Sequence, residues 1–298
     1  MNNLNIFTLV SFLIASTSIF AQKKITLIDS KTNNPIPFYG LNFNNNLFYS
    51  NKNGIVDILE YNATDTLFFE MPEFESKKVL VNDVKDTVYL NFINENLLDE
   101  ITININKTPI KIKTTSNRVT ATPIKPGREI IEKVIFSENY IGSHIKKITA
   151  SINRDFITYN KKRETKNYEI CLRINFYDYN LNKIESSEPI TFKQQKRNLL
   201  EFELTNKIKI PKEEIHIGVE FIGVIDTNGN FESIDDFYLR PLIFIKESNE
   251  VNSNIYIRNN TSKKRPDSIY NIINHQFKRY KNIKNVKGNT HIFSYEIQ

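Results

Sequence analysis

Apolar and polar side chains alternate along most of the second half of this chain. The alternation is clearest over residues 168–177 and recurs over residues 200–205 and 215–221. Because successive side chains of a strand point to opposite faces, the pattern predicts strands with one face in a core and one face in water. Such strands are typical of antiparallel sheets packed as a sandwich. The predicted wet face of the first of these strands carries Glu169, Cys171, Arg173 and Asn175.

Further extended runs complete this second half. They are Ile145–Ile152, Tyr238–Lys246, Asn254–Arg258 and the closing segment His291–Ile297. One segment differs, since the apolar residues of Ser268–Tyr280 recur at helical spacing after a Pro266-Asp267 start. We therefore predict that residues 128–298 form a jelly-roll-like antiparallel β-sandwich with one short helix.

The first part of the chain is a series of short extended runs separated by turn signals. A polar turn cluster, Asp29–Asn34, comes before a Pro35-Ile36-Pro37 step, and prolines in a sheet are confined to edges or strand ends. Asn53-Gly54 is a hairpin signal, because both residues accept a positive φ. The predicted strands are Ile25–Ile28, Phe38–Phe43, Ile55–Ile58, Thr66–Met71, Lys78–Val81 and Thr87–Phe92.

The order of these motifs resembles a carboxypeptidase-D regulatory-like domain. The resemblance rests on Asp29–Pro37, on Ser50–Val56 and on Leu98-Asp99-Glu100-Ile101, a phrase that often follows this domain in envelope proteins of the Bacteroidetes type. It covers residues 22–103 and implies a prealbumin-like, seven-stranded sandwich without catalytic residues of its own. The glycine that usually opens the first strand of the family is missing, and Tyr39-Gly40 departs from its pattern.

A looser resemblance concerns the second half. The strand 168–177, the turn Asn180-Leu181-Asn182 and the strands 200–205 and 208–221 are similar in order to the jelly-roll-like region that accompanies such domains. Residues 104–127 between the two halves are rich in Lys, Thr, Asn and Pro, which predicts a partly extended linker.

The first 21 residues have the pattern of an export signal. Ile6–Phe20 is an apolar run of the length of a secretory signal, and cleavage is expected after Ala21. The alternative is an uncleaved N-terminal anchor, since Met1–Asn5 has no basic residue. No other stretch is apolar enough to span a bilayer, so the mature chain is expected to have no transmembrane span. The expected location is the periplasm, the outer membrane or the medium.

Charge and cysteine content narrow the possible partners. The net charge of +6 is concentrated in residues 259–298, which could in principle meet phosphate or anionic lipid. We interpret this tail as a solvated, Lys-rich end, because it contains no nucleic-acid-binding motif. Cys171 is the only cysteine, so no intrachain disulfide can form, and we interpret it as a small apolar filler.

Candidate chemistry is sparse. The histidines are His144, His216, His275 and His291, and the His216–Glu220 pair lacks the spacing of a helical zinc motif. Gly142-Ser143-His144 lacks the flanking glycines of a nucleophile elbow. Asp226, Asn228, Asn230 and Glu232 alternate as calcium ligands do, but Gly229 is misplaced for an EF-hand turn. We therefore expect no catalytic, cofactor-binding or metal-binding residues and no cofactor.

Three functions remain open. The first is a non-enzymatic envelope or secreted protein that acts as a binding or scaffolding module, with an envelope protein or a glycan as partner and no nucleic acid. The alternative is a glycan-binding module on the polar face of the second sandwich, with Tyr159, Tyr168, Tyr177 and Tyr179 as aromatic platforms. The third is a hydrolase that uses Glu201, Glu203, His216 and Glu220 as an acid/base patch.

Overall fold

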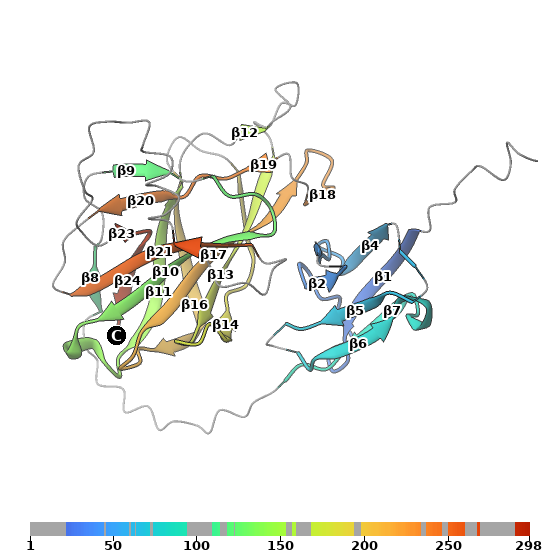
Figure 1. Cartoon of the computed structure of the whole chain (residues 1–298), viewed down its shortest axis with the longest axis horizontal. Helices are drawn as coiled ribbons and strands as arrows, with labels where there is room; N and C mark the ends of the chain where they lie inside the picture. Colours follow the sequence, from blue (N-terminus) through green and yellow to red (C-terminus); the bar gives the residue numbers. More distant parts are fainter. Residues whose placement is uncertain are drawn as a thin grey trace, which may run out of the picture.

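The structure is a computed structural model with two β modules side by side (Figure 1). The regular secondary structure of its described residues is almost entirely strand, with only the short 3-10 helices η1 (Val81–Asp83) and η2 (Glu138–Tyr140), which confirms the all-β sandwich prediction. The structure describes residues 22–44, 46–59, 61–62, 64–71, 74–93, 109–113, 118–121, 123–152, 157–158, 168–193, 198–233, 237–245, 250–259, 267–268 and 290–298.

The first module comprises the strands β1 to β7 in two sheets. One sheet has the order β4-β1-β7 and the other has the order β3-β2-β5-β6. The β1–β7 pair is parallel, and the other pairs are antiparallel. The strands are β1 (Gln22–Asp29), β2 (Gly40–Phe43), β3 (Asn46–Tyr49), β4 (Ile55–Leu59), β5 (Thr66–Phe69), β6 (Lys77–Leu80) and β7 (Thr87–Leu90).

The core of the first module lies between these two sheets. Leu27 of β1 and Val88 of β7 come from one sheet, and Leu41 of β2 and Phe69 of β5 come from the other. The alternating pattern of β2 and β5 buries every second residue, as a strand with one face on a core requires. Ile36 lies in the same core between Pro35 and Pro37, and Pro35 forms an isolated bridge with Ile28.

Asn53-Gly54 forms a turn, but the predicted hairpin is wrong. The strands on either side of the turn belong to different sheets, because β3 pairs with β2 while β4 pairs with β1. The Asn51 side chain explains the turn: its Oδ1 accepts the N–H groups of Asn53 (2.9 Å) and Ile55 (3.1 Å). This Asx-type turn carries the chain from one sheet to the other instead of folding it back on its neighbour.

We expect Gly54→Ala to destabilise the protein by about 2 kcal/mol or more, through a left-handed backbone and a clash. Gly54 has a φ of +74°, and an added Cβ would lie 2.7 Å from the Leu27 carbonyl oxygen. Gly127→Ala is the matched control, because Gly127 has the same φ of +74° but nothing within 4 Å of an added Cβ. Urea unfolding of both variants separates the two effects, and equal losses would contradict the close contact at Gly54.

The second module comprises the strands β8 to β24, mostly in two antiparallel sheets. The large sheet has the order β14-β13-β17-β10-β21-β22, with β15 paired to β13 and β18 to β17. The opposing sheet has the order β16-β11-β24-β8. Two smaller sheets, β12-β19 and β23-β20-β9, complete the described part. The strands are β8 (Ile110–Ile112), β9 (Arg118–Ala121), β10 (Arg128–Phe136), β11 (His144–Ile152), β12 (Ile157–Thr158), β13 (Glu169–Tyr177), β14 (Lys183–Ser186), β15 (Ile190–Lys193), β16 (Asn198–Lys209), β17 (Ile215–Ile225), β18 (Phe231–Glu232), β19 (Phe237–Tyr238), β20 (Leu242–Ile245), β21 (Val251–Asn259), β22 (Asp267–Ser268), β23 (Thr290–His291) and β24 (Phe293–Ile297).

The core of the second module lies between the large sheet and the opposing sheet. Ile174 of β13 and Val219 of β17 meet Phe202 of β16 and Phe293 of β24 in one apolar cluster. The predicted apolar faces of these strands are therefore confirmed, including the return of the closing segment 291–297 to a sheet, where β24 pairs with both β11 and β8.

Two sequence predictions about the second module need correction. Part of the predicted linker 104–127 belongs to its sheets, because β8 pairs with β24 and β9 pairs with β20. These strands are only three and four residues long and lie in a stretch rich in Lys, Thr, Asn and Pro, so no periodic pattern marks them. The predicted helix start Pro266-Asp267 is also wrong in its described part, because Asp267 and Ser268 form β22 beside β21. The rest of the predicted helix Ser268–Tyr280 lies outside the described residues.

The largest correction concerns the face of β13 and β17 that the sequence predicts to be in water. The polar residues on this face are buried. Arg173 is 3% exposed, Asn175 0% and Glu220 4%. Contacts from the first module lie over this face of the large sheet.

Other predictions fall outside the described residues. These are the signal 1–21, the phrase Leu98–Ile101 and most of the basic tail 259–298. The described part of the chain contains no helix of the length and apolarity needed to cross a bilayer.

Candidate functional site

The two modules meet in an apolar contact on the outer face of the large sheet. Phe38 and Tyr49 of the first module pack with Cys171 of β13 and Ile222 of β17, and all four are buried. The ring of Phe38 also contacts that of Phe231 edge-on, with centroids 5.6 Å apart. We call this contact and the polar residues beside it the junction.

Phe38 joins the modules through its backbone as well as its ring. The Arg173 Nη2 donates to the Phe38 carbonyl oxygen over 2.6 Å. Phe38 has a φ of +53°, in the left-handed region that is costly for a bulky side chain. Such a conformation persists where surrounding contacts hold it, and here these are the guanidinium, the Phe231 ring and the bond from Phe38 N–H to the Ser50 carbonyl.

Glu220 is the polar centre of the junction. Its carboxylate accepts hydrogen bonds from the Tyr49 hydroxyl of the first module and from Asn175 Nδ2 (3.0 Å). Arg173 Nη1 lies 3.9 Å from the same carboxylate. A buried charge is tolerated only when it is paired and hydrogen-bonded, and Glu220 receives partners from both modules.

A second carboxylate, Glu129 of β10, lies on the other side of Asn175. Its Oε1 accepts a hydrogen bond from Asn175 Nδ2 (2.9 Å), and both its oxygens accept from the Tyr177 hydroxyl at 2.9 and 2.8 Å. Arg258 Nη2 pairs with Glu129 Oε2 at 3.0 Å, and the guanidinium lies 4.3 Å from the centroid of the Tyr177 ring. Asn175 therefore bridges two buried carboxylates.

Their environments shift the pKa values of the two carboxyl groups in opposite directions. Burial raises the pKa of Glu129, and the opposing charge of Arg258 does not outweigh it. Burial acts in the same sense on Glu220, but the charges of Lys183 and Arg173 and the hydrogen bonds from Tyr49 and Asn175 lower its pKa to about 2. Two carboxyl groups with separated pKa values resemble an acid/base pair. Both groups are buried, however, and their described hydrogen bonds are made to protein side chains.

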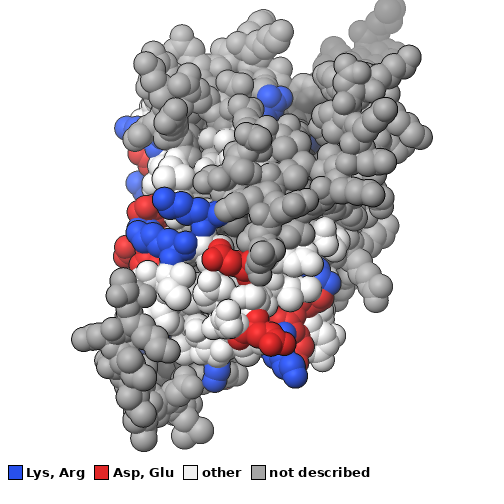
Figure 2. All heavy atoms as spheres, turned by 90° about the vertical axis from the view of Figure 1, so that its left-hand side faces the viewer, with Lys and Arg blue, Asp and Glu red and all other residues white. Residues whose placement is uncertain are grey.

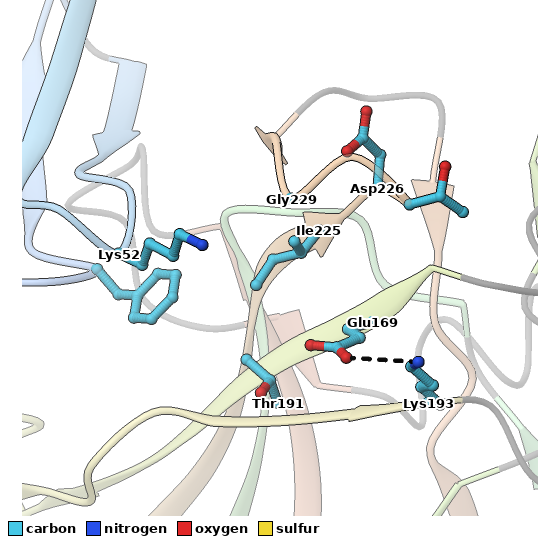
Figure 3. A pocket seen from close by; sticks show the side chains of 9 residues that line it. Lys52, Glu169, Thr191, Lys193, Ile225, Asp226 and Gly229 are labelled. Atoms are coloured by element: carbon cyan, nitrogen blue, oxygen red, sulfur yellow. Dashed lines mark ion pairs between the residues drawn. The ribbon is translucent and has the colours of Figure 1, made fainter.

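An open cleft lies beside the junction, between the two modules. It has a volume of about 530 Å³ and is lined by Phe38, Lys52, Glu169, Thr191, Lys193, Ile225, Asp226, Thr227 and Gly229. Figure 3 shows Lys52 reaching into it from the first module, with the Glu169–Lys193 pair on the opposite wall. We call it the junction cleft. It offers a place for a ligand, since polar groups from two modules surround an accessible space.

The structure does not assemble the acid/base patch considered from the sequence. Glu201 and Glu203 lie on β16 of the opposing sheet, and Glu201 pairs with Lys147 at 2.5 Å. His216 and Glu220 lie on β17 of the large sheet. The His216 Nδ1 lies 3.1 Å from the Asp178 carbonyl oxygen, and burial lowers the pKa of this histidine.

The aromatic platform considered for a glycan is not assembled either. Tyr177 is buried in the junction, Tyr168 packs against the core, and Tyr179 is 60% exposed. Tyr159 lies outside the described residues. A row of exposed rings on the polar face of the large sheet is therefore not available on β13.

The predicted calcium-like loop is a hairpin turn between β17 and β18. Asp226 Oδ1 accepts the N–H groups of Asn228 (2.8 Å) and Asn230 (2.7 Å), and its Oδ2 accepts from Asn230 Nδ2 (3.0 Å). Glu232 is the second strand residue beyond the turn and pairs with Val224. Within the described ranges, no three His, Cys, Asp or Glu side chains are grouped to hold a metal ion.

A second buried cluster lies in the core of the second module. The His291 Nδ1 lies 2.8 Å from Ser253 Oγ and 3.1 Å from Glu132 Oε1. A catalytic triad needs the serine and the carboxylate on different ring nitrogens, whereas here both approach Nδ1. All three side chains are at most 1% exposed. Glu132 Oε2 also accepts the N–H groups of Ile292 and Phe293, which indicates a structural role.

Cys171 is confirmed as an apolar filler of the junction, and burial raises its pKa to about 12. Because the thiolate is the reactive form, we expect no labelling of the native protein by a disulfide reagent at pH 8, and one thiol per chain after unfolding in urea. The absorbance of the thiolate released from the reagent measures the labelling of the native protein and of the unfolded protein. Rapid labelling without urea would show that the junction opens readily.

Positive and negative side chains alternate on the face of the second module that is remote from the first. Figure 2 shows Lys or Arg beside Asp or Glu over the described part of this face. The ion pairs Lys111–Glu296 and Lys147–Glu201 of the opposing sheet have the same mixed character. The described surface there lacks the single-signed patch typical of a nucleic-acid-binding face.

No family model, curated protein or solved structure matches this chain.

Proposed function

We propose that this chain is a non-enzymatic binding or scaffolding protein of the cell envelope or the extracellular space, in which the two sandwiches act as one body. The observation that carries this proposal is the junction. Interfaces between domains of one chain are ordinarily polar and permit relative motion. A buried carboxylate that takes partners from both modules favours a fixed arrangement, which suits a protein that presents a surface.

The polar residues with the most unusual environments support this assignment. Glu129 and Glu220 are engaged by Tyr177, Asn175 and Tyr49, so their hydrogen-bonding capacity is directed at the protein itself. A catalytic acid or base must reach a substrate atom within hydrogen-bonding distance. The junction cleft, which is open, is lined by neither carboxylate.

The export signal and the resemblance to a carboxypeptidase-D regulatory-like domain support the location. Both favour a location outside the cytoplasm, and the family implied by the resemblance has no catalytic residues in this domain. Glycan binding, considered from the sequence for the polar face of the second sandwich, is proposed instead for the junction cleft, where Thr191 and Thr227 supply hydroxyls and Lys52 and Lys193 supply cations. The polar face of β13 and β17 is covered and offers no such surface.

Co-sedimentation with insoluble envelope and extracellular polymer tests the proposal. Residues 22–298 are compared with the cleft variant Lys52→Glu/Lys193→Glu and with the matched variant Lys24→Glu/Lys111→Glu. Lys24, Lys111 and Lys193 have similarly exposed side chains, at 69%, 67% and 67%, each facing one carboxylate.

We expect the native chain and the matched variant to be retained and the cleft variant to be lost. Equal retention of all three, or none, would overturn binding at the cleft. Turnover of glycoside, ester or peptide substrates that disappears in Glu129→Gln would overturn the non-enzymatic assignment.

A further inference from the structure

The charged side chains that line the junction cleft differ in whether they have a hydrogen-bond or ion-pair partner. Asp226 is engaged by the N–H groups of Asn228 and Asn230 within its own turn. Glu169 shares its charge with Lys193 across 4.0 Å on one wall. On the other wall, no carboxylate within the described ranges lies close enough to Lys52 to form an ion pair with it.

Lys52 is carried on a rigid part of the first module. It lies in the turn where Asn51 Oδ1 accepts the N–H groups of Asn53 and Ile55. The ammonium group reaches the second module, since a Cβ added at Gly229 would lie 3.7 Å from the Lys52 Nζ. The turn thus holds a cation over the space between the two modules, where an anion could approach it.

The remaining lining favours a small hydroxylated skeleton. Thr191 and Thr227 supply hydroxyl groups, and the Glu169–Lys193 pair supplies an acceptor and donors. Apolar contact is limited to Phe38 and Ile225, so a wholly apolar ligand would leave most of the lining unpaired. The volume of about 530 Å³ lies within the range of small-molecule sites.

We propose that the junction cleft binds a carboxylate carried on a polyhydroxylated carbon skeleton, with Lys52 as the counter-charge of the carboxylate and with Thr191, Thr227 and the Glu169–Lys193 pair bonded to the hydroxyls. This inference rests on the proposed function and specifies its ligand. The ligand is either a free sugar acid or an acidic residue of a longer glycan.

Binding at this place also bridges the modules. Lys52 and Phe38 belong to the first module, while the other lining residues belong to the second. A ligand that contacts both walls adds a connection to the one that Tyr49, Phe38 and Arg173 already make. Ligand binding is therefore expected to raise the unfolding temperature of the whole chain, and the rise should continue with the logarithm of the ligand concentration once that concentration exceeds Kd.

Calorimetric titration and thermal unfolding test the proposal with three probes: glucuronate, a short oligogalacturonate and neutral glucose. We expect the acids to bind and to raise the unfolding temperature, and glucose to do neither. Lys52→Gln should weaken acid binding about tenfold or more, because it removes the counter-charge while keeping a polar side chain. Lys24→Gln changes another exposed lysine of the first module and should leave acid binding unchanged.

The relative affinities of the two acids show whether the ligand is a free sugar acid or an acidic residue of a longer glycan. Oligogalacturonate binding at least about tenfold tighter than glucuronate indicates a polymer residue, and equal affinities indicate a free sugar acid. The proposal is overturned if neither acid binds better than glucose, or if Lys52→Gln and Lys24→Gln bind the acid equally well. If the acids fail while the cleft variant still loses retention on the envelope fraction, only this ligand class is wrong. If the cleft variant and the matched variant are also retained equally, binding at the cleft fails together with this ligand class.

Discussion

Replacing Glu220 by glutamine is expected to lower the free energy of unfolding by about 3 to 5 kcal/mol, the usual cost of breaking a buried ion pair from one side. The amide keeps one oxygen for the Tyr49 hydroxyl but places an N–H₂ group towards Asn175 Nδ2, so that two donors face each other. Arg173 loses the anion beside it. Urea unfolding followed by circular dichroism measures the change.

Glu201→Gln is the matched control for this variant. Glu201 also pairs with one cation, Lys147, but its side chain is 53% exposed. An exposed pair contributes at most about 1 kcal/mol, so the control should stay close to the native protein. If both variants lose the same amount, the burial of Glu220 in the junction contributes nothing.

The difference in the free energy of unfolding between the native protein and Glu220→Gln is expected to depend on pH. The pKa of Glu220 is lowered from 4.5 to about 2 in the folded protein. Its stabilisation is therefore complete above pH 4.5 and is lost as the pH falls towards 2, so the native protein and Glu220→Gln should converge over this window. Glu129 acts with the opposite sign, because its raised pKa means that protonation relieves a cost. A constant difference between the two proteins from pH 6 to pH 2.5 would contradict the assignment.

Replacing Glu132 by leucine is expected to cost about 3 kcal/mol or more, because it leaves two buried backbone N–H groups without an acceptor. Glu132 Oε2 accepts from Ile292 (2.8 Å) and Phe293 (3.0 Å) and thereby ties β10 to the start of β24 across the core. Leucine fills much of the same volume, so a loss of packing contributes little to the difference.

Glu132→Gln serves as the conservative counterpart. Its carbonyl oxygen can still accept the two backbone N–H groups, and its amide faces His291 Nδ1, which accepts a hydrogen bond in the other tautomer. We expect Glu132→Gln to retain most of the stability. Equal losses in the two variants, measured by thermal unfolding, would show that the negative charge matters more than the acceptor.

Much of the fold follows from local patterns in the sequence. The two-residue alternation of Ile170, Leu172, Ile174 and Phe176 identifies the core face of β13, because only burial on one side produces it. The turn signals of Asp29 and Gly54 likewise mark where the first strands end. These features depend on neighbours in the chain, so the sequence contains the information directly.

The junction could not be predicted in the same way. Alternation shows that Arg173, Asn175 and Glu220 share the face opposite the core, but it does not say what covers that face. The cover is Phe38 and Tyr49, more than 120 residues earlier in the chain. Glu129, Asn175, Tyr177 and Glu220 become neighbours only through the pairing of β10, β13 and β17, which local patterns in the sequence do not show.

The backbone of Phe38 has a consequence for how this chain can change over generations. Its carbonyl meets a guanidinium from the other module, and the neighbouring Tyr49 meets the Glu220 carboxylate there. Exchange of either half by genetic recombination would leave the Arg173 guanidinium and the Glu220 carboxylate without their partners from the other module. The two halves are therefore expected to descend together, with substitutions on one side followed by compensating substitutions on the other.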